Sequence, residues 1–205
     1  MRFSDDEFKF REIINKILII KNINIGINLA RENTVDNFDS ILCYCYVDEE
    51  AGISFEYLSS YILKGNILLN NLKKDCMYKF RFKNIENDEY IIFNNENTGI
   101  NDIDIKIKKI KEFYDSNEDT KELRKYTIFD PFRVNGFPDH VEIYLYKEGL
   151  NTEKLYVRLC KTDGERNFGK LLNEPYQDFG IHLHDIIEIF ILKYNSGKII
   201  LLHQC

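Results

Sequence analysis

The chain has 205 residues, of which 44% are hydrophobic and 30% charged, and its formal net charge is -6. This size and composition are typical of a folded globular protein with one good core or two small ones, and they exclude a largely disordered chain. An acidic balance also argues against a general nucleic-acid-binding protein, which usually carries a basic surface, so nucleic acid is not an expected partner.

The sequence carries no pattern for membrane insertion or secretion. Its best apolar segment, 13–20, is interrupted by Asn15 and Lys16 and is too short to span a bilayer. The N-terminus is acidic and lacks the basic start of a secretory signal. The five cysteines are odd in number and scattered, which suits reduced, buried thiols. We therefore expect a cytoplasmic protein without membrane contact.

The N-terminal part mixes helical and extended patterns. Ser4 and Glu7 have capping-box spacing and favour a helix over about 5–18, and the alternation that follows favours a strand. Residues 40–47 are β-branched and aromatic and predict a strand. Residues 53–64 are ambiguous and fit a short helix or an irregular strand.

The middle of the chain changes from a predicted hairpin to a predicted helical segment. Residues 77–83 and 89–93 form the clearest hairpin pattern of the first half. Apolar residues at helical spacing then predict a helical segment of about 101–127, made of two helices that meet near residue 117. Two of the three prolines fall in 130–139, which indicates an ordered linker or the edge of the next module.

Short strands separated by turn residues fill the C-terminal part; they cover 141–147, 155–161, 168–172, 185–194 and 198–203. This spacing predicts a small antiparallel β barrel or a strongly bent sheet. The expected fold is therefore α+β, with a mixed α/β-hairpin domain over 1–129 and a β domain over 130–205. A weak internal similarity between 41–94 and 154–203 fits either a structural repeat or chance similarity in a biased composition.

A distinctive stretch runs from Gly169 to Leu192. Its Asn173-Glu174-Pro175 segment forces a turn or extended conformation before the proline, and Gly180 permits a positive φ, so we expect a stiff loop. The mainly apolar, isoleucine-rich run that ends at Leu192 predicts a well-buried strand.

Two aromatic residues of this stretch, Tyr176 and Phe179, lie on the stiff loop, and Phe132 and Phe137 lie in the segment 130–139 before it. Aromatic side chains on constrained loops either plug the end of a barrel or form a binding surface, and the plug is slightly favoured.

The histidine cluster His182-x-His184-Asp185 is a candidate metal site. Alternate residues of a strand project to the same side, so the two imidazoles could share a metal ion, with Asp185 or Asp178 as an oxygen ligand. A catalytic metal site usually needs a third protein ligand, and the pattern names none clearly, so two solvated or hydrogen-bonded histidines are favoured. Cys43-x-Cys45 lacks the spacing of a redox or zinc motif and predicts buried core cysteines.

Several motifs of the C-terminal third carry a resemblance to known sequences; they are Asp130-Pro131-Phe132-Arg133, Phe137-Pro138-Asp139, Tyr156-Val157-Arg158-Leu159, Leu171-Leu172-Asn173-Glu174-Pro175, Gln177-Asp178-Phe179-Gly180 and Asp185. This third resembles a family of uncharacterised bacterial proteins with a small β domain. The resemblance implies no assigned activity and no catalytic residues. The chain departs from the pattern at His184, where such domains often have a glycine before the aspartate.

No phosphate-binding loop, dinucleotide-binding glycine pattern or nucleophile elbow is present in the sequence, so we expect no cofactor and lean against an enzyme. The leading expectation is a non-catalytic module that binds another protein, with an immunity-like role as one version. The expected contact residues are Phe132, Phe137, Asn173, Tyr176, Asp178 and Phe179. The alternative is a metal-dependent hydrolase that uses His182, His184 and Asp185.

Overall fold

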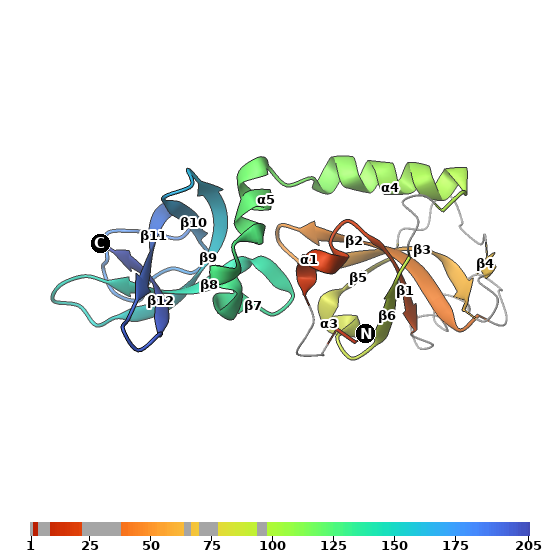
Figure 1. The fold of residues 1–205 in the computed structure, drawn as a ribbon. Coiled ribbons are helices and arrows are strands. Elements are labelled where there is room, and N and C mark those ends of the chain that lie inside the picture. Colours follow the sequence, from red (N-terminus) through yellow and green to blue (C-terminus); the bar gives the residue numbers. More distant parts are fainter. Residues whose placement is uncertain (1, 4–8, 22–37, 64–66, 70–77, 94–97) are drawn as a thin grey trace. The chain divides into compact units, whose positions relative to one another are not determined.

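The computed structural model divides the chain into two compact units, Met1–Asp115 and Ser116–Cys205 (Figure 1). It describes residues 2–3, 9–21, 38–63, 67–69, 78–93 and 98–205. The expected boundary at 129/130 lies further along the chain than the observed one, because the second helix of the middle segment packs on the C-terminal strands. Each unit is described by itself below.

In its described residues, unit 1 is an antiparallel sheet with three helices. The helices are α1 (Phe10–Ile13), α3 (Phe82–Ile85) and α4 (Asn101–Tyr114). The strands are β1 (Ile17–Lys21), β2 (Ser40–Asp48), β3 (Gly52–Ile62), β4 (Ile67–Leu69), β5 (Lys79–Arg81) and β6 (Glu89–Ile92). The strand order is β4-β3-β2-β1-β6, and β5 pairs separately with β3.

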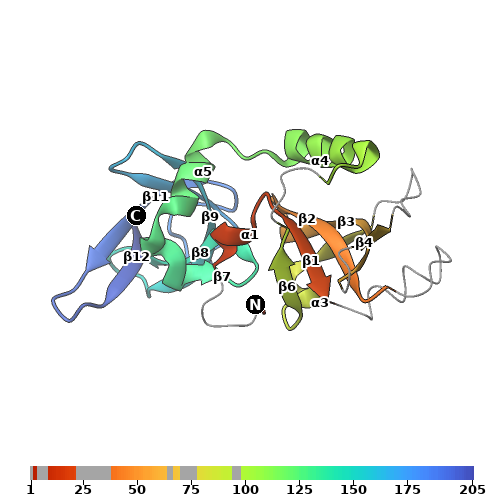
Figure 2. The same cartoon turned by 45° about the vertical axis from the view of Figure 1, so that its right-hand side comes forward.

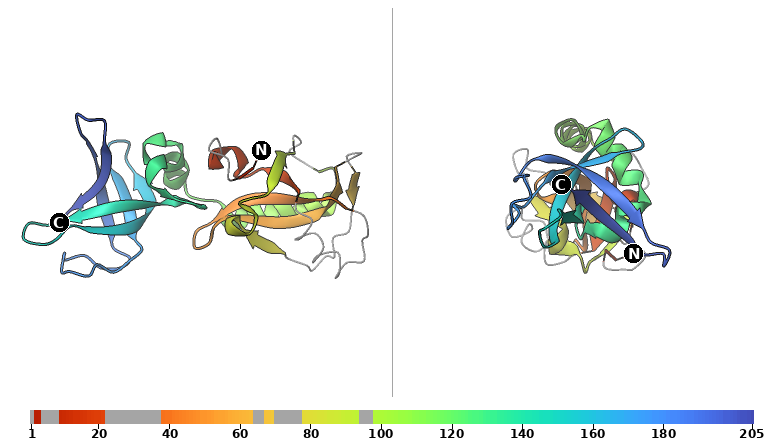
Figure 3. Two further views of the ribbon diagram at one scale, coloured as in Figure 1. Left: turned by 90° about the horizontal axis from the view of Figure 1, so that it is seen from below. Right: turned by 90° about the vertical axis from the view of Figure 1, so that its left-hand side faces the viewer.

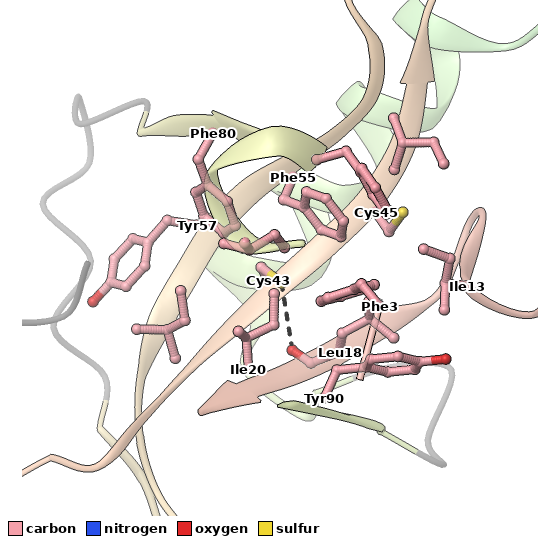
Figure 4. Packing of buried hydrophobic residues seen from close by; sticks show 14 residues of the cluster. Phe3, Ile13, Leu18, Ile20, Cys43, Cys45, Phe55, Tyr57, Phe80 and Tyr90 are labelled. Carbon is pink, nitrogen blue, oxygen red and sulfur yellow. Dashed lines mark hydrogen bonds between the residues drawn. The ribbon is translucent and has the colours of Figure 1, made fainter. Parts of the chain in front are cut away.

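Both faces of this sheet are buried because the central strands are apolar on both sides. On β2, Cys43 and Cys45 point to one core, which Figure 4 shows, and Tyr44 and Tyr46 point to the other. Helix α4 lies over the second face (Figure 2) and contributes a stripe of buried isoleucines: Ile103, Ile107 and Ile110. The prediction of buried core cysteines is confirmed for Cys43 and Cys45, and burial raises the pKa of both thiols.

Strand β3 shows which alternative holds for 53–64, since the segment is an irregular strand over its described part. Its register against β2 shifts by one residue at Leu58, which is a β-bulge. Because the bulge reverses the alternation, Leu58 and Tyr61 lie on the same face although they are three residues apart. This spacing imitates a helix in the sequence.

The expected hairpin of 77–83 with 89–93 is also wrong over its described part. Strand β5 pairs with β3, and β6 pairs with β1, so the two strands are not partners. The short helix α3 separates them and buries Phe82 and Ile85. Neighbours in sequence are therefore not neighbours in this sheet.

Unit 2 begins with helix α5 (Glu118–Lys125) and the 3-10 helix η1 (Thr127–Phe132). Its strands are β7 (Arg133–Val134), β8 (Phe137–Tyr146), β9 (Glu153–Thr162), β10 (Asn167–Leu171), β11 (Ile186–Lys193) and β12 (Ile199–Gln204). Strands β8 to β12 pair in chain order, and β12 then pairs in parallel with β8 (Figure 3, cyan to blue). The expected α+β fold with a small C-terminal barrel is confirmed, and the barrel is closed.

The segment 130–139 is the edge of the barrel unit, which is one of the two expectations for it, since it contains the end of η1, β7 and the start of β8. The two units also differ in strand order, so the weak similarity between 41–94 and 154–203 is not favoured as a structural repeat.

One apolar core fills the barrel, and α5 and η1 share it. Leu123 of α5 and Phe129 of η1 are buried together with the inward rows of β8 and β9. Arg124 fastens α5 to the barrel, because its Nε and Nη2 atoms donate to the Asp139 carboxylate at 2.7 and 2.6 Å. Among the described residues, none of the helices has the length and apolar character needed to cross a bilayer.

Candidate protein-interaction site

The loop between β10 and β11, residues 172–185, is held by one carboxylate of the barrel. Glu153, at the start of β9, accepts the backbone N–H of Tyr176 at 2.9 Å on Oε2. Its Oε1 accepts the backbone N–H and the side-chain Nε2 of Gln177 at 2.9 and 2.8 Å. Burial tends to raise the pKa of Glu153, but these hydrogen bonds lower it overall, because they stabilise the ionised form.

The middle of the loop is also tied to the connection between β8 and β9. Gln177 Nε2 donates to Asn151 O at 2.8 Å, and its Oε1 accepts from Asn151 N at 3.1 Å. Lys147 Nζ donates to Asp178 O at 2.9 Å, and Asp178 Oδ1 accepts the Gly180 N–H at 3.0 Å. The loop backbone is thus fixed at several consecutive residues.

A second carboxylate, that of Glu174, closes the loop on itself. Its Oε2 accepts the Leu183 N–H at 2.6 Å, and its Oε1 lies 2.9 Å from His182 Nδ1. The hydrogen bond with His182 lowers the pKa of Glu174, and the same contact raises the pKa of His182. Both side chains are exposed, so this clasp is accessible to solvent.

Residues 182–185 form a turn, which corrects the premise of the metal hypothesis. Strand β11 begins only at Ile186, so the alternation of a strand does not apply to His182 and His184. The Asp185 N–H donates to His182 O at 3.0 Å, and Asp185 Oδ2 accepts the His182 N–H at 2.8 Å. His184 has φ 78°, so it adopts the left-handed conformation that similar turns often give to glycine.

These contacts engage two of the three candidate metal ligands. His182 Nδ1 faces Glu174, and Asp185 is engaged with the backbone of its own turn. In the part of the chain that the structure describes, no three His, Cys, Asp or Glu side chains form a group that could hold a metal ion.

The aromatic residues of the loop have opposite environments. Phe179 is only 2% exposed and packs in the barrel core, so it serves as a plug and offers no contact surface. Tyr176, three residues earlier, is 96% exposed. The other two predicted contact residues of the loop, Asn173 and Asp178, are exposed as well, and Asn173 Oδ1 accepts the Tyr156 N–H at 3.2 Å.

The structure does not bring Phe132 and Phe137 to this loop. Phe132 is half-buried against the barrel core, and the Phe137 ring stacks on His140 at 5.0 Å. Phe137 begins β8, whereas the loop contacts Lys147, just beyond the other end of that strand. The six predicted contact residues therefore do not form one surface.

The sequence interpretation missed an exposed apolar row on β11. The prediction of a well-buried strand is right only for the inward row, which contains Ile187 and Ile189. The outward row consists of Ile186, Glu188, Phe190 and Leu192. Its three apolar members are exposed, and so is Tyr194 just after the strand. Apart from Glu188 both rows are apolar, so the sequence has no clear alternation that separates the buried side from the exposed one. Several exposed apolar side chains on one strand are typical of a contact site.

No protein-family model matches the chain, and neither does any curated protein or solved structure. The resemblance of the C-terminal third to bacterial β domains therefore stays a prediction.

Proposed function

We propose that this chain is a non-catalytic protein-interaction module whose contact element is the β10–β11 loop together with the outward row of β11. The observation that carries the proposal is Tyr176, which is 96% exposed on a backbone held by Glu153. A large aromatic side chain in water has no role in the stability of the barrel. On a fixed backbone it is suited to enter a pocket of another protein.

The fixed loop lowers the entropy that binding has to overcome. Ordering a mobile loop opposes association, whereas a loop that already has its bound conformation avoids this loss. The hydrogen bonds that Glu153 and Glu174 accept, and the one that Gln177 donates, fix the backbone on both sides of Tyr176. A tyrosine adds a large contact area with few rotatable bonds and a hydroxyl group for a polar contact.

Closure of the barrel restricts the way in which a partner binds. Each of the strands β8 to β12 has a neighbour on both sides, so the barrel offers no free edge to an added strand. The partner must be recognised through side chains. An immunity-like role, in which the module neutralises another protein, is one version of this proposal.

The test is a pull-down from lysate of the source cells with the intact protein and two variants as bait, followed by quantitative mass spectrometry. Tyr176→Ala removes the exposed ring of the loop. Phe113→Ala is the matched control, because Phe113 is a 79% exposed aromatic residue on α4. We expect at least one protein to be captured by the intact chain and by the control but lost with Tyr176→Ala.

The affinities of the intact chain and of Tyr176→Ala for a captured partner then give the contribution of the Tyr176 ring to binding. Truncation of an aromatic hot spot raises the Kd by roughly 30-fold or more, which corresponds to about 2 kcal/mol. If every captured protein binds Tyr176→Ala and Phe113→Ala equally well, this loop is not the contact element.

A further inference from the structure

An apolar patch lies on the outside of the β11–β12 hairpin (Figure 3, dark blue). Side chains directly opposite each other in the register share one face of a sheet, so Phe190 lies beside Leu202 and Leu192 beside Ile200. The parallel pairing of β12 with β8 adds Tyr144 beside Leu202. Phe190 is 41% exposed and Leu192 is 39% exposed, although both have apolar neighbours. We call these five residues the hairpin face.

Lysines without ion-pair partners among the described residues surround the hairpin face; they are Lys161, Lys170, Lys193 and Lys198. Lys170 lies opposite Ile186, where β11 begins. Lys193 ends β11, and Lys198 begins the return of the chain, where its carbonyl oxygen accepts the Tyr194 N–H at 2.9 Å. The two ends of the exposed strand therefore each carry a cation that is available to a partner.

The acidic side chains near the hairpin face do not neutralise these lysines. Glu188 is the one acidic residue within β11 and β12, both of which the structure describes in full. It lies opposite Phe168, and Lys161 Nζ lies 5.7 Å from the centre of the Phe168 ring. Four lysines against one glutamate make the surroundings of the hairpin face positive, whereas the whole chain has a formal charge of -6.

Two further basic side chains of this side of the barrel already have carboxylate partners. Lys154 Nζ lies 2.9 Å from Glu142 Oε1, and Arg166 Nη2 lies 2.8 Å from Asp163 Oδ2. The chain thus pairs some of its cations internally and leaves those around the hairpin face without a partner in its described part. This charge pattern favours an acidic partner.

The other unit shows how this chain covers an apolar sheet face. Helix α4 lies on the sheet of unit 1 with a stripe formed by Ile103, Ile107 and Ile110. Beside that stripe, Lys106 Nζ lies 2.8 Å from Glu56 Oε1 of β3, so the helix carries the charge opposite to that of the sheet. The corresponding cover for a sheet face bordered by lysines is a helix bordered by carboxylates.

We propose that the hairpin face is the docking site for an amphipathic helix of a partner protein, with an apolar stripe bordered by Asp or Glu. This inference rests on the proposed function and adds the chemistry of the partner. Apolar residues three and four positions apart form the stripe, and the acidic residues beside it reach the lysines. A second copy of this chain does not fit, because it would bring the same four lysines against its own.

The test is an NMR titration of the full chain with two synthetic helical peptides that share one leucine stripe. Glutamates border the stripe in the first peptide, and lysines border it in the second. We expect the glutamate peptide to shift the amide signals of β11 and β12 and to bind at least tenfold more tightly than the lysine peptide. This preference should weaken as salt is added, because salt screens exposed charges.

Charge reversal identifies the lysines that attract the peptide. Lys161→Glu/Lys198→Glu should raise the Kd for the glutamate peptide by roughly tenfold, the effect of two exposed ion pairs. Lys9→Glu/Lys109→Glu is the matched control, since both lysines are exposed in unit 1, have no ion-pair partner among the described residues, and give the same change of net charge. We expect the control to change the Kd by less than about twofold.

Three results overturn the proposal: no shifts with either peptide, equal affinity for the two peptides, or an equal change of Kd in the two double variants. Vesicles of phosphatidylglycerol are the further probe. If they shift the same amides and the glutamate peptide does not, the hairpin face binds an anionic membrane surface and the proposal fails. The peptides do not test the loop, so a partner lost with Tyr176→Ala would still support the proposed function after such a failure.

Discussion

Removal of the Lys106 ammonium should destabilise unit 1 more than the removal of an exposed ion pair would. Lys106→Met keeps the length of the side chain but leaves Glu56, which is 1% exposed, without the cation that lies 2.8 Å from its Oε1. Breaking a buried pair from one side costs about 3–5 kcal/mol, because a carboxylate then stays buried without compensation. The Lys106 side chain is 19% exposed, so we expect about 3 kcal/mol, the lower end of that range.

The assay is urea unfolding followed separately in each unit, through amide signals of β2 and β3 and of β8 and β9. This separation is needed because a chain with two units does not have one unfolding free energy. The double variant Lys106→Met/Glu56→Gln should recover most of the loss, since a neutral pair needs no cation.

The matched control is Lys108→Met. Lys108 lies 3.9 Å from Glu112 on the exposed side of the same helix, so its replacement should change the stability by less than about 0.5 kcal/mol. If Lys106→Met lowers the free energy of unfolding as little as Lys108→Met does, the ion pair of Lys106 and Glu56 is solvated and does not behave as a buried pair.

Three further predictions concern unit 2. His184→Gly should raise its unfolding free energy by about 1 kcal/mol, because His184 has φ 78°; chemical denaturation measures this, and a lower stability would contradict the assignment of strain to this turn. Gly169→Ala should lower the stability by about 1–3 kcal/mol, since its Cβ would lie 2.8 Å from Val157 Cγ2; a neutral result would mean that the barrel wall yields easily. The raised pKa of His182 contributes stability that is complete below pH 6.5 and is lost as the pH rises through the pKa of the folded state. The lowered pKa of Glu174 contributes stability that is complete above pH 4.5 and is lost as the pH falls through the pKa of the folded state. The contact between His182 and Glu174 therefore stabilises unit 2 most between pH 4.5 and 6.5. An NMR titration should show a lower His182 pKa in Glu174→Gln, and equal values in the two proteins would show that the contact does not form in solution.

The sequence predicts the helices and strands of this fold better than it predicts which strands pair with one another. The α4 and α5 helices and the barrel strands follow from periodicity and turn residues. The pairing of β5 with β3 and of β6 with β1 does not, because pairing depends on contacts between residues far apart in the chain. The bulge at Leu58 adds one residue to β3, and this converts a strand pattern into a helical one.

The candidate site shows the same division. Proline and glycine predict a stiff loop, but its stiffness depends on Glu153, which lies on another strand and gives no local signal. Tyr176 and Phe179 have similar residue types and neighbouring positions, and only the path of the backbone places one in water and the other in the core. His184 replaces the expected glycine without loss of the turn, since histidine is among the residues that tolerate a positive φ.

The closing pair of the barrel has a consequence for how the chain folds. Four of its strand pairings join consecutive strands and can form locally, but the fifth brings Leu202 beside Tyr144. The entropy of this long loop opposes closure before any contact across it is made, which slows folding in proteins with such distant pairings. Until that step, β8 and β12 have unpaired edges that can recruit strands of other chains. The protection against aggregation that a closed barrel provides is therefore complete only after the last contact of folding has formed.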